Sequence, residues 1–468
     1  MILEEILHAP PPEALALAWR GEPGFFYLDS GRPEDGSGRA FSFLGFAPFL
    51  TWQAKGDGCV VTTGGLREEV QTEPLAHLRD LLRRYQTSSS VAGDIPFGGG
   101  AVGYFGYEFG VRSEKVPISA PDDPTLPDAR FGFYDGFIAY EHGSGKTFAV
   151  ANPVAQQSAE KILARLHGAV AHAAQSGGRK TAQPNRHHPG ATALIPNLTR
   201  AEYIKRIGRI KDYIAAGDVY QVNFAQRFEL ATTDDPYAIY QRLRRLSPAP
   251  FGAYLNGGDF QILSSSPELF LRSDGRGGMI TRPIKGTRPR GRTAEEDRRL
   301  SAELSASEKD HAELLMIVDL ERNDLGRVCR YGSVRVEERH RIETHPTVFH
   351  LVATISGELA AGRDVFDGLC SMLPGGSITG APKIRAMQII NELEPCRRHV
   401  YTGSIGYLGF DGSCDFNVAI RTILCRPGRA QYHVGGGIVA DSDPESEYQE
   451  TLTKGRAMRA ALLGEELS

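Results

Sequence analysis

The sequence predicts an α+β fold built from antiparallel β-sheets, and three observations support this prediction. Strand-like runs dominate the first part of the chain, as at residues 24–28 and 137–140, with an amphipathic helix near residues 75–85. Short strands and long helices intermix in the rest without the regular alternation that a parallel βαβ sheet requires. The 468 residues suffice for two or three average domains, or for one unusually large one.

One segment interrupts this pattern. Much of residues 171–195 is rich in Gly, Ser, Gln and Pro and has no hydrophobic period, so we interpret it as a linker or a surface insertion. It separates an N-terminal part, residues 1–170, from a longer C-terminal part, residues 196–468.

Composition excludes several classes of protein. With 53 basic and 57 acidic residues the net charge is −4, so nothing indicates a nucleic-acid partner. No apolar run approaches the ~20 residues that span a membrane, and the N-terminus lacks the pattern of a signal peptide. The six cysteines form no C-x-x-C pair, which is typical of a reducing compartment. We expect a cytoplasmic protein.

Two acidic couplets are candidates for a metal site. Asp310 and Glu313 lie three residues apart in a helical pattern and share a face. Near the C-terminus, residues 443–444 read as a helix cap followed by a first-turn proline, and Glu447 and Glu450 share a face of that helix. Two such helices could converge on Mg²⁺, which prefers carboxylate and water oxygens. The alternative for each couplet is solvated surface charge.

Lys285 lies between an apolar strand pattern and a Gly-Thr turn. A desolvated amine has a lowered pKa and can act as a nucleophile at neutral pH. Taken alone, the residues favour the alternative of an ordinary exposed lysine in a basic loop.

Residues 374–383 form a Gly/Ser/Thr-rich loop that leads into a helix with proline in its first turn. The free amides at such a helix start can bind a carboxylate or a phosphate, but the spacing of a nucleotide P-loop is absent. Three glycine runs, at residues 98–100, 375–376 and 435–437, also indicate a close approach of backbone amides to an anion.

Together, five segments resemble the chorismate-utilising enzymes, a group that holds anthranilate synthase, isochorismate and salicylate synthases, and aminodeoxychorismate synthase component I. They read GDVYQVN (217–223), SSPE (265–268), IVDLERNDLG (317–326), GSITGAPK (376–383) and DSDPESE (441–447). The resemblance runs from about residue 197 to residue 459 and more weakly over the N-terminal part. It implies one large α+β unit in which two antiparallel sheets pack against each other with helices outside. Residues 171–195 would then be an insertion.

The resemblance also implies roles for individual residues. It makes Glu268 the acid that protonates the departing C4 hydroxyl of chorismate, and it places His350 beside that hydroxyl. It implies that Glu313 and Glu450 bind Mg²⁺ directly, while Asp310 and Glu447 act through water. The groups around the substrate would be Gln221, Gly286, Thr287, Ser377, Tyr401, Arg421, Gly435, Gly437 and Lys454.

Within the group, the Pro-Ile-Lys-Gly-Thr sequence at residues 283–287 resembles that of aminodeoxychorismate synthase component I, whereas anthranilate synthases usually carry alanine in place of the lysine. The implied reaction is attack of Lys285 on C2 as the C4 hydroxyl leaves, followed by ammonia at C4, to give 4-amino-4-deoxychorismate, a precursor of p-aminobenzoate and folate. Gln221 stands where isochorismate-type enzymes carry a water-activating lysine, which argues against water as the nucleophile.

Two alternatives remain open: anthranilate synthase component I, which shares everything except Lys285, and a non-catalytic chorismate-binding subunit. No part of the chain reads as a glutamine amidotransferase, so ammonia is expected from a separate glutaminase subunit. In relatives the N-terminal part also binds tryptophan, and residues 28–30 match that motif only loosely.

Overall fold

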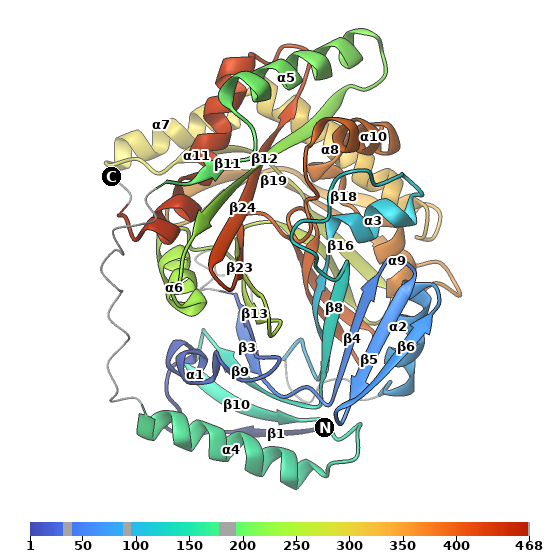
Figure 1. Ribbon diagram of the computed structural model, residues 1–468, viewed down its shortest axis with the longest axis vertical. Helices are drawn as coiled ribbons and strands as arrows, with labels where there is room; N and C mark the ends of the chain where they lie inside the picture. Colours follow the sequence, from blue (N-terminus) through green and yellow to red (C-terminus); the bar gives the residue numbers. More distant parts are fainter. Residues whose placement is uncertain (31–39, 88–94, 177–192, 467–468) are drawn as a thin grey trace.

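Two large antiparallel sheets face each other and carry helices on their outer faces (Figure 1). The structure, a computed structural model, describes residues 1–30, 40–87, 95–176 and 193–466. Every strand pairing in these ranges is antiparallel, as the sequence predicts, and the two-sheet sandwich implied by the family resemblance is confirmed.

The first sheet has 12 strands within the described residues. In spatial order they are β1 (Ile2–Glu5), β10 (Lys146–Ala151), β9 (Gly136–Glu141), β3 (Phe41–Gly45), β2 (Phe26–Asp29), β13 (Phe251–Asn256), β14 (Gln261–Ser266), β23 (Thr422–Arg426), β24 (Arg429–Ile438), β12 (Gln221–Ala231) and β11 (Ile195–Pro196), while β20 (Gly380–Ala381) also pairs with β12.

The second sheet likewise has 12 strands in the described ranges. Their order is β17 (Ile284–Pro289), β19 (Val348–Glu358), β16 (Gly278–Arg282), β15 (Leu269–Asp274), β22 (Ser413–Val418), β21 (Ser404–Gly409), β7 (Gly100–Phe105), β8 (Ala129–Tyr134), β4 (Leu50–Lys55), β5 (Gly58–Thr63) and β6 (Leu66–Gln71), while β18 (Arg335–Thr344) pairs with β19.

Each sheet joins strands from both sides of residues 171–195. In the first sheet β2 pairs with β13, and in the second β7 pairs with β21. Neither the N-terminal nor the C-terminal strands therefore make up a complete sheet of their own.

The helices divide between the two outer faces and the edge at β12. Helices α1 (Pro12–Trp19), α4 (Ala159–Ser176), α6 (Pro236–Leu246) and α11 (Pro444–Leu463) pack on the first sheet. On or near the second lie α2 (Pro74–Arg84), α3 (Tyr107–Ser113), α7 (Ala294–Ser305), α8 (Glu308–Gly326) and α9 (Val365–Met372). Helices α5 (Arg200–Ala215) and α10 (Lys383–Leu393) flank β12. Figure 1 shows α5 and α11 together at the top and α4 along the bottom beside β10.

Three apolar clusters fill the spaces between these layers. One lies between the sheets and is rich in aromatic rings, among them Phe43, Phe97 and Tyr407. The other two lie under the helices of each outer face. No helix in the described ranges combines the length and apolarity needed to cross a membrane.

Local signals in the sequence predict several of these elements well. Helix α2 matches the amphipathic pattern near residues 75–85, and the predicted cap at residues 443–444 is confirmed, because the Asp443 side chain accepts from the amide of Ser446 at 2.9 Å. The predicted linker begins inside helix α4, which continues to Ser176 with an apolar stripe that was not recognised in the sequence. Residues 177–192 lie outside the described residues.

The junction of N- and C-terminal strands in the second sheet needs glycine. Gly103 of β7 pairs with Gly406 of β21, and a Cβ on Gly103 would overlap the carbonyl oxygen of Arg130 on β8. Any side chain there must push strands apart.

We predict that Gly103→Ala lowers the free energy of unfolding by at least about 2 kcal/mol, because overpacking this junction displaces backbone rather than a flexible side chain. Urea denaturation followed by circular dichroism measures it. Gly208→Ala is the matched control: no atom lies within 4 Å of its added Cβ, and alanine in helix α5 should be neutral or stabilising. Equal stability of the two variants would contradict the prediction.

Candidate functional site

A bulge in strand β17 positions Lys285. The register between β17 and β19 shifts between Ile284 and Thr287, so that Lys285 and Gly286 form the extra loop of backbone. Gly286 has φ +81°, and a Cβ there would lie 2.9 Å from the Asp310 carboxyl carbon on α8. Glycine is therefore required both for the backbone conformation and for the close packing on that helix. The bulge leaves Lys285 only partly exposed, unlike the ordinary exposed lysine that its sequence context favours.

Charged groups of both signs surround the Lys285 amine. Burial lowers its pKa, and the ammonium of Lys454 lowers it further, whereas Glu313, Glu268 and Glu450 oppose the change. The Lys285 Nζ atom also donates to the carbonyl oxygen of Ser377 at 3.4 Å. The net effect is an amine that loses its proton more readily than a surface lysine.

Glu268 lies in the link between β14 and β15 and is 5% exposed. Burial raises the pKa of its carboxyl, while Ser377, Lys285 and Arg421 act in the opposite direction. The Ser377 hydroxyl is close enough to lower the pKa of Glu268. Within the described part of the chain, however, neither the Ser377 hydroxyl nor the Glu268 Oε1 atom has a partner of normal hydrogen-bond geometry. Buried polar atoms without partners are rare, so this pair is open to a ligand.

His350 on β19 faces the same region and is 2% exposed. Its Nδ1 atom lies 3.0 Å from the Thr287 hydroxyl. Burial lowers the pKa of its imidazole far below the usual value, and the charges of Arg421 and His345 add to the effect. His350 is therefore neutral at physiological pH and can exchange hydrogen bonds without carrying charge.

The four acidic residues lie on α8 and α11, as the sequence predicts. Asp310 and Glu313 are in the first turns of α8, which Ser307 caps. Gly436 of β24 faces the other pair: a Cβ there would lie 3.2 Å from Glu447 Oε2 and 3.5 Å from Glu450 Oε1. Burial raises the pKa of Glu313, and the negative charge of Glu450 raises it too, so these two carboxyls lie close enough to interact.

Within the described residues, however, no three His, Cys, Asp or Glu side chains are gathered closely enough to hold a metal ion. Basic side chains pair with some of the acidic groups instead: Arg288 pairs with Asp310 at 3.2 Å, and Lys454 pairs with Glu450 at 2.7 Å. In its chemistry the donor set fits Mg²⁺, because all four groups are hard carboxylates. Burial and Glu450 also raise the pKa of Glu447, a repulsion that a divalent cation would relieve.

The remaining predicted substrate residues lie on or beside strands β12 and β24. Gln221 is fully buried, and neither of its amide atoms has a hydrogen-bond partner in the described ranges. It lies against Gly437, where a Cβ would come within 2.7 Å of its amide nitrogen. The carbonyl oxygen of Gly435 accepts from Lys454 at 3.2 Å, and Tyr401 is buried with its ring stacked on His433.

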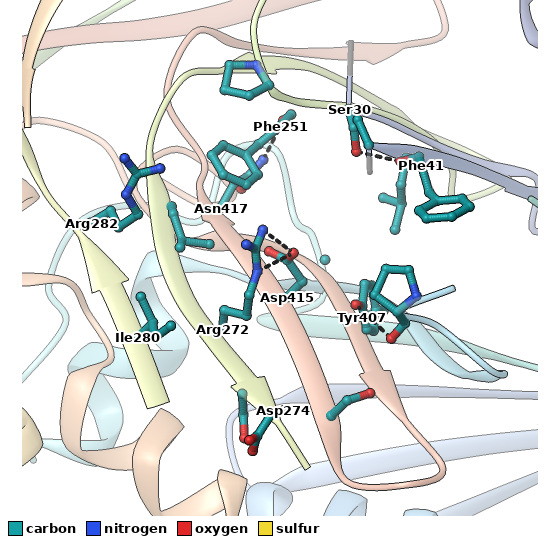
Figure 2. Close-up of a pocket in the computed structure, with 18 of the residues that line it drawn as sticks. Ser30, Phe41, Phe251, Arg272, Asp274, Ile280, Arg282, Tyr407, Asp415 and Asn417 are labelled. Atoms are coloured by element: carbon teal, nitrogen blue, oxygen red, sulfur yellow. Dashed lines mark hydrogen bonds and ion pairs between the residues drawn. The ribbon is translucent and has the colours of Figure 1, made fainter. Parts of the chain in front are cut away.

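A cleft of about 1970 Å³ lies elsewhere, between the two sheets. Figure 2 shows Arg272 facing Asp415 on its floor, with Arg282 and Ile280 on one side and Ser30 and Phe41 on the other. The residues that line the cleft do not include Lys285, Glu268 or His350, although Pro267, Leu269 and Ile284 are among them.

The tryptophan-motif segment, residues 28–30, also lines this cleft. Its Asp29 carboxylate pairs with Arg244 and accepts from the Tyr240 hydroxyl at 3.3 Å. Tryptophan binding there stays a prediction.

The family model for chorismate binding enzymes matches residues 25–460. The chain belongs to the chorismate binding enzyme family. It is 41% identical over 457 residues to anthranilate synthase component 1 of Thermus thermophilus, covering 97% of this chain and 96% of the relative. It is 39% identical over 432 residues to aminodeoxychorismate synthase component 1 of Bacillus subtilis, covering 92% and 90%.

A solved structure gives the same family at the level of the fold. The chain matches anthranilate synthase component I from Streptococcus pneumoniae with a TM-score of 0.76 and 31% identity, over 92% of this chain and 94% of the other. The protein is thus a chorismate-utilising enzyme of the anthranilate or aminodeoxychorismate synthase type. Relatives of both kinds match at similar identity, so they do not distinguish the two products.

The sequence analysis overlooked several residues of this chorismate-family site. Lys309 lies 3.9 Å from Glu313, and its i, i+4 spacing could have revealed it. The Ser442 hydroxyl donates to Glu447 at 2.7 Å, a role that its place in the motif at residues 441–447 does not indicate. The sequence gives no local signal that pairs Arg288 with Asp310, because the two are 22 residues apart.

We predict that Lys454→Met raises the pKa of Lys285, because it removes a neighbouring positive charge and frees Glu450. The pH dependence of Lys285 acetylation by dilute acetic anhydride, followed by peptide mass spectrometry without divalent cations, measures this. The midpoint should move to higher pH than in the wild type, and the exposed-lysine control Lys205→Met should leave it unchanged. An unchanged or lower midpoint in Lys454→Met would refute the electrostatic account.

Proposed function

We propose that this enzyme aminates chorismate at C4 to give 4-amino-4-deoxychorismate, with Lys285 as a covalent nucleophile. The observation that carries the proposal is the bulge in β17, which holds a lysine of lowered pKa between Glu268 and the acidic helices α8 and α11. An amine nucleophile needs such an environment to be unprotonated at neutral pH.

Chorismate carries two carboxylates, so its site needs cations and hydrogen-bond donors in a region that excludes water. Arg421 and Lys454 supply the charges. Thr287, Tyr401 and the backbone around Gly286 supply hydrogen bonds, and the adjacent glycines of β24 let the substrate lie close to the strand. Gln221 offers a buried neutral amide whose two polar atoms lack partners in the described residues.

Mg²⁺ is part of this proposal. Glu313 and Glu450 would hold it directly, and Asp310 and Glu447 would hold it through water. When bound, it would neutralise a carboxylate of the substrate and the repulsion among these acidic side chains.

Glu268 is the proposed general acid. Hydroxide leaves poorly, so cleavage of the C4–O bond needs a proton from a positioned group. Burial raises the Glu268 pKa toward the range in which a carboxyl can hold a proton for this purpose, and its Oε1 atom is available. Neutral His350 is the proposed hydrogen-bonding group for the same hydroxyl.

The proposed reaction has two steps. The Lys285 nitrogen bonds to C2, the two ring double bonds each shift by one position, and the C4 hydroxyl leaves as water with the proton from Glu268. Ammonia then bonds to C4, the double bonds return, and the C2–N bond breaks to release Lys285. Lys285 and ammonia each give up one proton on bonding, which restores Glu268 and the leaving lysine, so that chorismate and ammonia yield the product and water.

Ammonia is proposed to come from a separate glutamine amidotransferase subunit. The relatives are each named component 1, which accords with a second component. Passage of ammonia between docked subunits would keep it from being lost to solvent.

The second candidate is anthranilate synthase component I, and the 41% identity to one such enzyme favours it. In that reaction ammonia itself would attack C2. We assign the attack on C2 to Lys285 instead, because a partly buried lysine of lowered pKa can act as that nucleophile, and this is why we prefer amination at C4.

Product analysis separates the two candidates. We predict that the wild type with chorismate, Mg²⁺ and ammonium salts forms 4-amino-4-deoxychorismate, identified by liquid chromatography with mass spectrometry. Lys285→Ala should abolish this product, and Lys205→Ala should not change it. Direct formation of fluorescent anthranilate by the wild type, or full C4 amination by Lys285→Ala, would overturn the proposal.

A further inference from the structure

Arg398 is the largest charged side chain that is fully buried in the described part of the chain, with 1% exposure. It follows helix α10 and forms a two-point ion pair with Glu394, at 2.6 and 2.8 Å. Its guanidinium lies over the ring of Tyr107, 4.6 Å from the centroid, and near that of Tyr401 at 5.7 Å. A buried arginine of this kind is retained only where its hydrogen bonds are satisfied.

The remaining donors of Arg398 reach the backbone around the chorismate site. One terminal nitrogen donates to the Ile378 carbonyl at 3.0 Å and to the Thr402 hydroxyl at 3.3 Å. The other donates to the Asn223 carbonyl at 2.6 Å. One side chain therefore connects the short 3₁₀ turn Gly376–Ile378, strand β12 and the turn that carries Tyr401.

The 3₁₀ turn is held between two cations. The Ser377 carbonyl accepts from Lys285, and the next carbonyl, that of Ile378, accepts from Arg398. Ser377 also presents its hydroxyl to Glu268. A shift of Ile378 would therefore move the groups that contact both the proposed nucleophile and the proposed acid.

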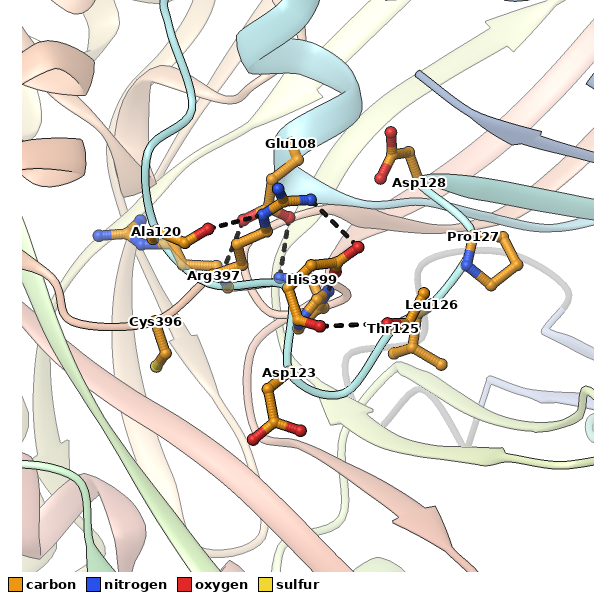
Figure 3. Close-up of polar contacts among 12 residues, drawn as sticks. Glu108, Ala120, Asp123, Thr125, Leu126, Pro127, Asp128, Cys396, Arg397 and His399 are labelled. Carbon is orange, nitrogen blue, oxygen red and sulfur yellow. Dashed lines mark hydrogen bonds and ion pairs between the residues drawn. The ribbon is translucent and has the colours of Figure 1, made fainter. Parts of the chain in front are cut away.

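Hydrogen bonds from its own backbone also hold Arg398 in position. Figure 3 shows Glu108, at the start of α3, pointing at the turn that contains Arg397 and His399. The Glu108 carboxylate accepts from the backbone amides of Arg398 and His399 at 2.8 and 2.9 Å. Glu394 in turn accepts from the amide of Ala225 on β12. Contacts with Glu108 of α3 and with Glu394 after α10, which is itself bound to β12, thus hold Arg398 in place.

We infer that Arg398 is a positioning residue for chorismate turnover, which sets the 3₁₀ turn carrying Ser377 against Lys285 and Glu268 and orients Tyr401. The inference deepens the proposed function and rests on it only in naming Lys285 and Glu268 as the reacting groups. A planar, forked guanidinium is needed because lysine cannot serve Glu394 and three further acceptors at once.

Arg397 provides a matched control in the adjacent position. It is also an arginine that donates to a backbone carbonyl, that of Ala120 at 3.0 Å, and it pairs with Asp122 at 3.3 Å (Figure 3). Both partners belong to the segment before β8 and not to the site. Loss of this contact should affect the local fold alone.

The test compares Arg398→Lys with Arg397→Lys, each alone and combined with Ser377→Ala. Chorismate consumption, which does not depend on which aminated product forms, gives kcat and KM, and urea denaturation shows that each variant is folded. We expect Arg398→Lys to lower kcat by at least about ten-fold, because small misplacements of reacting groups cost large factors in rate. Arg397→Lys should stay within about two-fold of the wild type.

The combined variants separate positioning from a merely structural role. If Arg398 acts through the turn of Ser377, its loss of kcat should shrink by at least about three-fold in the Ser377→Ala background. An equal loss in both backgrounds, or a kcat for Arg398→Lys within about two-fold of that for Arg397→Lys, overturns the inference. Formation of anthranilate by the wild type would overturn the proposed function without changing this comparison.

Discussion

The close packing of Gly286 against Asp310 is the contact on which the rest of the site depends. It lets β17 bulge toward helix α8 instead of running flat along β19, and the bulge turns Lys285 toward the acidic residues of α8 and α11. In a flat strand side chains alternate between the two faces; the bulge breaks this alternation, so that Ile284 and Thr287 stand opposite Val352 and His350, two residues that share a face of β19. The conformation at φ +81° makes glycine the residue for this position.

Lysine and carboxylate side chains lie close together around that contact and are partly or fully buried. Lysines and carboxylates from separate parts of the chain act on the pKa values of Lys285, Glu268 and Glu313, and burial decides the direction of these three shifts. Each group is moved toward its neutral form. A site of this kind is ready to accept charged ligands, since a dianionic substrate and a divalent cation would supply the charges that burial disfavours.

The sequence predicts much of the fold and names the candidate site residues, but it does not predict how those residues are arranged. Caps such as Asp443 and the helical spacing of residues 310 and 313 are local signals, and both are confirmed. The pairing of β2 with β13 and of β7 with β21 is not local, because it joins strands more than two hundred residues apart through side chains that any sheet could bury. Helix α4 was missed since its apolar stripe ends in a Gly- and Ser-containing stretch that favours a linker.

The same limit explains what the sequence could not say about Lys285. Its bare context favours an exposed lysine, and the bulge, the packing of Gly286 and the neighbouring carboxylates come from elements far apart in the chain. Arg398 is a further example: nothing around residue 398 indicates that its partners are Asn223, Ile378 and Thr402. Short motifs identify such residues, but only tertiary contacts show which of them act on one another.

The most direct test of the covalent role of Lys285 is to trap the enzyme without ammonia. Wild type and Lys285→Ala are incubated with chorismate and Mg²⁺, quenched in acid and digested for peptide mass spectrometry. The account predicts a mass increase equal to chorismate less water on the peptide that carries residue 285 in the wild type, and none in the variant. Absence of that adduct in an enzyme that consumes chorismate once ammonia is added would contradict it.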